Sequence, residues 1–300
     1  MPIAKNFIPQ GGIMKKILLS LMILGAVFTG CGKKDMPDKA DNKAKTEIKT
    51  ASLSNMANED SFKFVEGVLK ENLGADNDMA AANVDKFLAM VKDYNQSVGE
   101  KNLIGDFKED LKPSYDSGVL IENRQKAEKK FPDTNCRINA FLLAIDNMKE
   151  RKSGAADDEI LFMDEEKIKE GKIFDRDNEE AFKKFFSRVP TDASKEPIKQ
   201  GKVMEDYLAN WSFPAKADLI SVVIHDNLDG NYLFIGHIGV LVKIEGGYLF
   251  VEKISFEEPY QAIKFPDKKA CYDYLKEKFK DYTDPSTCPP FVMDNGKYVG

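Results

Sequence analysis

Histidine and cysteine limit the chemistry open to this 300-residue chain, because the chain has only two histidines and four cysteines. Histidine is the side chain whose ordinary pKa lies closest to neutral pH. Any mechanism with a histidine base must therefore use His225 or His237. Sites that need a cluster of histidines are excluded.

Cys136 is the cysteine best placed for nucleophilic chemistry. Cys31 ends a signal-like segment described below, so three cysteines remain and at least one of them lies outside any intramolecular disulfide. Cys271 and Cys288 are seventeen positions apart and could pair if the geometry allows, which would leave Cys136 free. A free thiol in an exported protein is either a small buried hydrophobic group or a reactive one.

The sequence before Cys136 predicts that this residue opens a helix. Pro132, Asp133, Thr134 and Asn135 end one segment, and an apolar helix-forming run follows. The positive end of a helix dipole and its free amides stabilise a thiolate and lower the thiol pKa from about 8.5. The same amides can donate to the oxyanion of an acyl intermediate. The alternative is a structural cysteine buried at a helix start.

His237 and Glu252 lie on two successive predicted strands. A hairpin that turns near 245–247 places a carboxylate at Glu252 beside His237, where it could orient the imidazole. A slip of one residue would place Lys253 there instead. The alternatives are a histidine at the rim of a half-buried strand, for His237, and a solvated strand end, for Glu252 and Lys253.

The elements that must position these residues follow from hydrophobic periodicity. Apolar residues spaced three and four apart predict helices near 62–73, 84–94, 136–148, 178–188 and 201–211. Runs rich in Val, Ile, Leu and Phe predict strands at 218–225, 232–243, 248–254 and 261–265, and a last helix follows Asp267. This order predicts an α+β fold, with a helical N-terminal half followed by an antiparallel β-meander.

These features resemble the papain-like fold of the NlpC-like cell-wall cysteine peptidases: a cysteine opening a helix, a His-Ile-Gly-Val strand beside a glycine hairpin, and a following strand that ends in a polar group. The resemblance implies that Cys136 is the nucleophile, His237 the base and Glu252 the residue that orients the base. Arg137 and Asn135 are the predicted substrate-binding residues, since a planar guanidinium suits a substrate carboxylate.

The chain also resembles an uncharacterised family of bacterial surface lipoproteins. The similarity rests on Asn135-Cys136-Arg137 and on the stretch from His237-Ile238-Gly239-Val240 to Glu257-Glu258-Pro259-Tyr260-Gln261. It covers about residues 60–280 and implies no activity. The acidic pair at 257–258 could bind amino groups of a peptide or form a turn.

Residues 14–30 form a predicted lipoprotein signal peptide: two lysines, a short apolar run and small residues that lead up to Cys31. The apolar run is shorter than the ~20 residues of a membrane span. Phe28-Thr29-Gly30-Cys31 resembles the bacterial lipobox, which implies cleavage before Cys31 and acylation of that cysteine. Residues 1–13 fit no targeting rule, so we expect the true start at Met14.

The predicted domains follow from these boundaries. Residues 31–58 are mainly polar, charged and small residues and predict a flexible tether. Residues 59–300 are predicted to form one α+β papain-like domain. The lipid on Cys31 would attach it to the bacterial cell envelope, on the outer side of the cytoplasmic membrane, in the periplasm or at the outer membrane.

Composition and charge exclude several classes of function. A net charge of -6 and 42% hydrophobic residues exclude a basic nucleic-acid binder, a disordered chain and a multi-span membrane protein. The segment 225–231 offers oxygen ligands but lacks the spacing of a calcium loop, so it predicts a hairpin turn. Zinc would need three or four close ligands. We therefore expect no metal and no cofactor.

Two functions are consistent with these patterns. The first is an envelope-anchored cysteine hydrolase that cleaves an amide bond in a peptide, such as a peptidoglycan stem peptide. The second is a non-catalytic surface lipoprotein that binds a ligand or partner. A catalyst requires Cys136 reduced, partly exposed and near His237, whereas a binding protein tolerates a buried Cys136.

Overall fold

The structure, a computed structural model, describes residues 47–75, 77–152 and 154–300. The predicted signal segment and Cys31 lie outside these residues. Within them, no helix combines the length and the apolar character needed to cross a membrane.

The described residues form helices joined to an antiparallel sheet. The helices are α1 (Glu59–Leu69), α2 (Asp78–Val98), α3 (Ser117–Lys126), α4 (Cys136–Ala144), α5 (Phe162–Gly171), α6 (Arg176–Phe185), α7 (Pro197–Leu208) and α8 (Lys268–Phe279). The strands are β1 (Ser52–Ser54), β2 (Lys149–Glu150), β3 (Val189–Pro190), β4 (Trp211–Ser212), β5 (Ala217–Asp226), β6 (Tyr232–Ile244), β7 (Gly247–Lys253), β8 (Tyr260–Phe265), β9 (Phe291–Asp294) and β10 (Lys297–Tyr298). Short 3₁₀ and π segments connect several of them.

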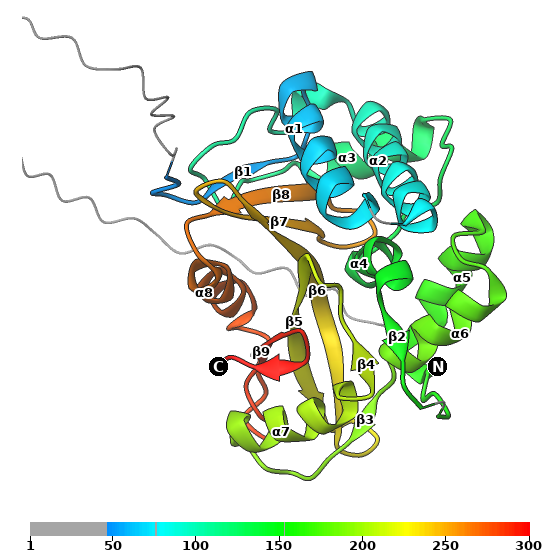
Figure 1. Ribbon diagram of the computed structural model, residues 1–300, viewed down its shortest axis with the longest axis vertical. Helices are drawn as coiled ribbons and strands as arrows, with labels where there is room; N and C mark the ends of the chain where they lie inside the picture. The colour runs from blue at the N-terminus through cyan, green and yellow to red at the C-terminus, as the bar shows by residue number, and fades with distance from the viewer. Residues whose placement is uncertain (1–46, 76, 153) are drawn as a thin grey trace, which may run out of the picture. The chain divides into compact units, whose positions relative to one another are not determined.

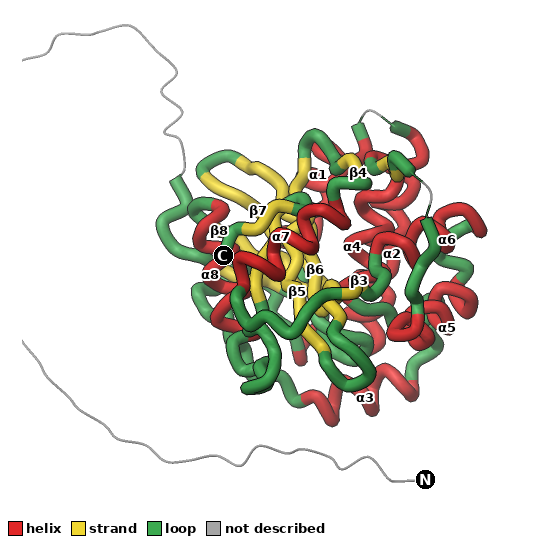
Figure 2. Tube along the Cα trace, turned by 90° about the horizontal axis from the view of Figure 1, so that it is seen from below, coloured by secondary structure: helices red, strands yellow, loops and turns green. Residues whose placement is uncertain are grey.

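The main sheet has the strand order β1-β8-β7-β6-β5-β9-β10, and β3 pairs with β6 outside this path. Every pairing is antiparallel, and β2 and β4 form a separate small sheet. Figure 1 shows α4 and α8 on opposite sides of the main sheet, with α1 to α3 beside β7 and β8. Figure 2 shows the same arrangement from below, with α5 and α6 away from α8.

The sheet separates two buried clusters. Nearly all of α4 is buried in the larger cluster, where Phe141 packs among the phenylalanines of α6. The smaller cluster lies under α8 and contains its residues Leu275 and Phe279. Burial on both sides explains why β5 and β6 are long, nearly continuous apolar runs.

Capping side chains fix the starts of the two helices that reach the site. Asn135 precedes α4 and accepts a hydrogen bond from the backbone N–H of Ile138 at 3.1 Å. Asp267 precedes α8 and accepts from the N–H of Ala270 at 2.8 Å. Each cap satisfies an N–H group that the first turn leaves without an intrahelical partner.

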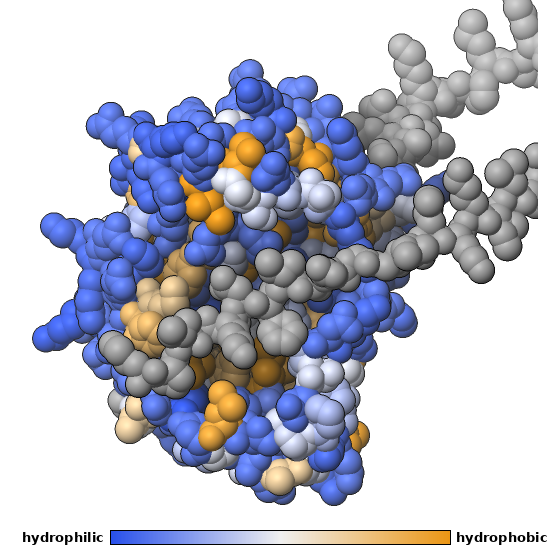
Figure 3. All heavy atoms as spheres, turned by 180° about the vertical axis from the view of Figure 1, so that it is seen from behind, coloured by the Kyte–Doolittle hydropathy of each residue, from blue (hydrophilic) through white to orange (hydrophobic). Residues whose placement is uncertain are grey.

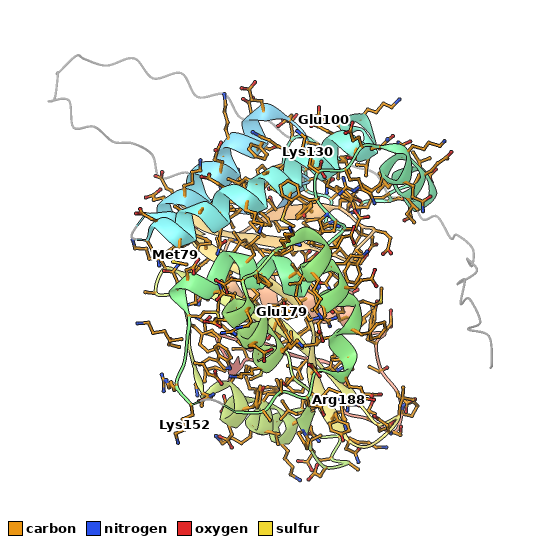
Figure 4. The ribbon with its side chains drawn as sticks, turned by 90° about the vertical axis from the view of Figure 1, so that its right-hand side faces the viewer. Met79, Glu100, Lys130, Lys152, Glu179 and Arg188 are labelled. Carbon is orange, nitrogen blue, oxygen red and sulfur yellow. The ribbon has the colours of Figure 1, made fainter. Side chains whose placement is uncertain are left out.

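Arg188, labelled near the lower end of the molecule in Figure 4, anchors the turn of the β5–β6 hairpin. Arg188 donates to Asp157 at 2.9 Å and to Asp229 in the hairpin turn at 2.9 Å. Its guanidinium also lies 4.2 Å from the ring centroid of Tyr232. The predicted turn at 225–231 is therefore a hairpin tied to the body of the fold.

On the face that Figure 3 shows, the visible surface is mainly hydrophilic, with apolar groups in smaller areas. Among the described residues, the large apolar side chains that are most exposed are Met79, Phe162, Met163, Ile198, Leu228 and Tyr282. Apart from Phe162 and Met163, which are adjacent at the start of α5, they come from separate elements, and scattered exposed apolar side chains are normal for a protein surface.

The predicted strands at 218–225, 232–243, 248–254 and 261–265 correspond to β5, β6, β7 and β8, and the predicted helices correspond to α1, α2, α4, α6, α7 and α8. Mixed helix and antiparallel sheet is therefore confirmed. The division into a helical half and a later meander is not strict, because β1 precedes the helices and pairs with β8.

The predicted tether extends too far into the chain at its C-terminal end. Residues 52–54 are a strand of the main sheet rather than part of a linker, and Leu53 is fully buried. Asn55 is buried too, and its side chain donates to the backbone carbonyl of Tyr260 at 2.8 Å. The ordered fold thus begins before residue 59, because a few apolar and amide groups find partners about 200 residues away.

Candidate functional site

The candidate site lies where β6 and β7 separate. The two strands pair from Ile244 and Gly247 as far as Val240 and Val251. Beyond that point β6 continues beside β5 and β7 continues beside β8. Figure 1 shows α4 next to this region of the sheet.

A β-bulge sets the direction of His237 on β6. Val222 of β5 lies opposite His237, but the next residue, Val223, lies opposite Ile235. Gly236 is therefore the extra residue of the bulge, and a Cβ there would overlap a neighbouring side chain. The bulge turns His237 toward the α8 side of the sheet, whereas Ile235 faces the larger core.

The structure brings Cys136, His237 and Glu252 into contact. Nε2 of His237 hydrogen-bonds Oε2 of Glu252. The thiol of Cys136 interacts with the same imidazole, and since Nε2 is engaged by Glu252, Nδ1 is the ring nitrogen left for the thiol. The ring of Phe279 stacks against the imidazole with centroids 4.9 Å apart, and Cys136 Sγ lies 4.0 Å from the carbonyl oxygen of Gly236.

Charges around the thiol favour its ionised form. Burial alone would raise the pKa of the Cys136 thiol. The charge and hydrogen bond of His237, the charge of Arg137 and the backbone N–H of Ile238 together hold that pKa below its usual value. Conversely, the pKa of His237 is raised despite burial, because the Cys136 thiolate and the Glu252 carboxylate stabilise the imidazolium.

Two residues of α8 complete the surroundings of Glu252, and sequence reasoning missed both. Oε1 of Glu252 accepts from the hydroxyl of Tyr274 at 2.8 Å and from Nζ of Lys278 at 2.9 Å. Burial opposes the carboxylate, but Lys278 and His237 hold the pKa of Glu252 well below its usual range. The i,i+4 spacing on the predicted last helix was the signal that could have identified this pair.

Asn135 and Arg137, the predicted substrate-binding residues, are both held by Asp164 of α5. Arg137 donates to Asp164 through Nε at 3.0 Å and Nη2 at 2.6 Å, while Nδ2 of Asn135 donates to it at 2.8 Å. Asp164 is fully buried. These contacts fix the start of α4 against α5, and a role in substrate binding stays a prediction.

Lys253 points away from the imidazole, so Glu252 and not Lys253 contacts His237. Its ammonium donates to backbone carbonyls of the 255–258 loop and lies 4.4 Å from the ring centroid of Tyr94. Burial lowers the pKa of Lys253 to about 7. Both Glu252 and Lys253 are buried, so the alternative of a solvated strand end is wrong.

The remaining cysteines and histidine of the described residues have structural surroundings. Cys271 and Cys288 are free and buried in different core clusters, so the open possibility of a disulfide between them is not realised. Burial raises the pKa of both thiols, that of Cys288 to about 11. Nδ1 of His225 accepts from the backbone N–H of Cys288 at 3.0 Å.

Cys136 is reduced and adjacent to His237, as a catalyst requires, but it is not partly exposed. Its exposed fraction is 5%. Within residues 47–75, 77–152 and 154–300, no group of three or more His, Cys, Asp or Glu residues is arranged to hold a metal ion.

Comparison with known proteins gives one match. The sequence profile of the family described as Domain of unknown function (DUF4300) matches residues 52–299, which begin at the first residue of β1. No curated protein and no solved structure matches the chain.

Proposed function

We propose that this chain, which belongs to the DUF4300 family, is a papain-like cysteine hydrolase that cleaves an amide bond and is anchored to the bacterial envelope by a lipid on Cys31. One observation carries the proposal. A thiol at a helix start lies beside an imidazole that is hydrogen-bonded to a carboxylate on the next strand, and the charges of these groups favour a thiolate beside an imidazolium.

The reaction assigns one step to each group. The thiolate of Cys136 attacks the carbonyl carbon of an amide, and the oxyanion receives hydrogen bonds from the N–H groups at the start of α4. His237 then gives its Nδ1 proton to the leaving nitrogen as the C–N bond breaks. Water, deprotonated by His237, hydrolyses the thioester and releases the acid and the thiol. Glu252 orients the imidazole throughout, because its Oε2 holds Nε2.

The order of the three groups also supports a papain-like arrangement. The cysteine comes first and opens a helix that packs on the antiparallel sheet, and the histidine and the acid follow on neighbouring strands. Peptides with accessible amides at the envelope, such as peptidoglycan stem peptides, are the substrate class that fits this reaction and the proposed anchor.

Alkylation of the thiols tests the proposal, with two built-in controls. Iodoacetamide should modify Cys136 well below pH 8, whereas Cys271 and Cys288, whose thiol pKa values are raised, should stay unmodified there. Mass spectrometry of the protein treated between pH 5 and 9 locates each modified thiol. His237→Ala should abolish the reaction of Cys136 at low pH.

Hydrolysis is the second measurement. The wild-type protein should release new amino groups from muropeptides or a peptide library, and Cys136→Ala should not. A Cys136 thiol that titrates normally and does not depend on His237 would overturn the proposal.

A second candidate, a non-catalytic lipoprotein that binds a ligand or partner, is favoured by the 5% exposure of Cys136. A peptide-linked electrophile distinguishes the two functions, because it must reach the thiol in the way a substrate does. Modification of Cys136 by this reagent supports hydrolysis. Modification by iodoacetamide alone, without hydrolysis of any peptide, supports binding.

A further inference from the structure

We propose that Lys278 and Tyr274 of α8 are positioning residues, and that Lys278 supplies the positive charge that allows Cys136 to exist as a thiolate in a buried site. The inference rests on the proposed function, which assigns the reactive thiolate to Cys136. The inference adds Lys278 as a fourth charged group beside Cys136, His237 and Glu252, on a helix that the proposed mechanism does not use.

The contacts around Glu252 form a closed triangle on the α8 side. Lys278 Nζ is 2.9 Å from Glu252 Oε1, and the Tyr274 hydroxyl is 2.8 Å from the same oxygen. Lys278 Nζ also donates to the Tyr274 hydroxyl at 2.9 Å. Gln261 of β8 lies 3.4 Å from that hydroxyl through its Oε1. One carboxylate oxygen is thus held by α8, which leaves the other for His237.

The titratable groups that face this carboxylate come from several elements: His237 of β6, Tyr274, Lys278 and Cys271 of α8, and Tyr115, which hydrogen-bonds Gln261 of β8. Of these, Lys278 and protonated His237 are the cations. Burial raises the pKa of Tyr115 and Tyr274, so both stay neutral near pH 7.

The charges explain what Lys278 contributes. With Cys136 and Glu252 ionised and His237 protonated, these three buried groups sum to one negative charge, and the Arg137–Asp164 ion pair beside the thiol adds no net charge. Lys278 makes the sum zero, and a buried site disfavours any net charge. Without Lys278, ionisation of the thiol would create a net negative site, so the thiol pKa must rise.

Lys278 lies between the buried carboxylate and a cavity. Its side chain is 23% exposed, and it lines a cavity of about 560 Å³ together with Tyr115 and Tyr274. The ammonium therefore contacts the buried carboxylate on one side and a solvent-accessible space on the other. Glu277 engages two other lysines of this cavity, Lys112 and Lys280, at 3.0 and 2.8 Å, which leaves Lys278 to Glu252.

The test compares the pH dependence of Cys136 alkylation in Lys278→Met, Lys278→Arg and Tyr274→Phe. Lys278→Met should slow alkylation at pH 6 by about tenfold, which corresponds to a rise of about one unit in the thiol pKa once ionisation leaves the buried site with a net negative charge. The curve should move to higher pH and reach the wild-type rate near its alkaline limit. Tyr274→Phe, which removes a neutral donor, should slow it by about threefold.

Two variants separate this effect from damage to the helix. Lys278→Arg keeps the charge and should restore most of the wild-type pH dependence. Lys269→Met removes another lysine of α8 whose partner, Asp273, is exposed, and should leave the curve unchanged. Peptide hydrolysis, once detected, should show both limbs of its pH profile moved to higher pH in Lys278→Met, because loss of the lysine also raises the pKa of His237.

The outcomes distinguish this inference from the proposed function. A normally titrating thiol in the wild type refutes the proposed function and with it the inference. A low-pH thiolate in the wild type that persists unchanged in Lys278→Met refutes the inference alone. Equal loss in Lys278→Met and Lys278→Arg, without a shift along the pH axis, would show a merely structural role and also refutes it.

Discussion

Glu252→Gln is the substitution that most directly tests the site, because glutamine keeps the shape of glutamate but changes its hydrogen bonding. Glu252 accepts hydrogen bonds at both oxygens, from His237 at Oε2 and from Tyr274 and Lys278 at Oε1. Glutamine offers only one acceptor oxygen, so its amide group must face a donor on one side. If the amide faces His237, it donates to Nε2 and moves the ring proton to Nδ1, where the imidazole can no longer accept the thiol proton.

The size of the effect follows from the charges. The imidazolium loses a contact with a buried carboxylate, and one close opposite charge is worth about 1 to 3 pKa units. The Cys136 thiol pKa rises as the imidazolium becomes less stable. We therefore expect alkylation of Cys136 at pH 6 to fall about 100-fold, and the deficit to shrink as pH rises, because hydroxide ionises the thiol without help.

The assay is the second-order rate constant of iodoacetamide with Cys136 between pH 5 and 9, with Glu257→Gln as the matched control. Glu257 is an exposed acid in the loop that follows β7 and should give the wild-type curve. Urea unfolding should show that Glu252→Gln remains folded, at a cost of about 1 to 3 kcal/mol for the charge-assisted hydrogen bonds lost. A folded Glu252→Gln protein with the wild-type rate at pH 6 would refute the role of the carboxylate.

Two further predictions concern other parts of the chain. Asp164→Asn should lower the free energy of unfolding by about 2 to 3 kcal/mol in urea titrations, because Arg137 loses the charge of its buried partner. Asp177→Asn, at an exposed ion pair, should change the free energy of unfolding little. If Asp164→Asn were as stable as the wild type, the anchoring role of Asp164 would be contradicted. Cys31→Ser should move the protein from the membrane fraction to the soluble exported fraction on cell fractionation, and continued membrane attachment would refute the lipid anchor.

Local sequence predicts the elements whose pattern is self-contained. The uninterrupted apolar runs of β5 and β6 predict strands because both faces of the sheet are buried there. Short strands have no such signal: β1 has three residues, and its partner β8 lies more than 200 residues away. Likewise, α5 is mostly charged and has only two buried residues, so apolar periodicity cannot reveal it.

In the candidate site, too, local sequence predicts some contacts, and others depend on the packing of distant segments. The contact between His237 and Glu252 could be predicted, since alternation along a strand and a tight hairpin constrain which residues share a face. Asp164 could not be predicted, because nothing in its own helix distinguishes it from neighbouring acids. The sequence left open whether Cys136 is buried, since exposure depends on how distant segments pack over the start of α4.

The separation of β6 from β7 accounts for why these groups meet. Where the ladder ends, backbone groups of β6 become available to a partner other than a strand. The N–H of Ile238 donates to the thiol, and the carbonyl of Gly236 lies 4.0 Å from Sγ. Continued pairing of β6 with β7 would give these groups to the sheet.

The same separation leaves room for the acid. In a continued register Glu252 would lie opposite Gly239, where the ring of Phe250 occupies the space that a side chain would need. A Cβ at Gly239 would lie 2.8 Å from the carbonyl oxygen of Val251, closer than real Cβ atoms approach. The glycine thus lets β7 pack closely against β6, while the bulge and the end of the ladder bring thiol, imidazole and carboxylate together.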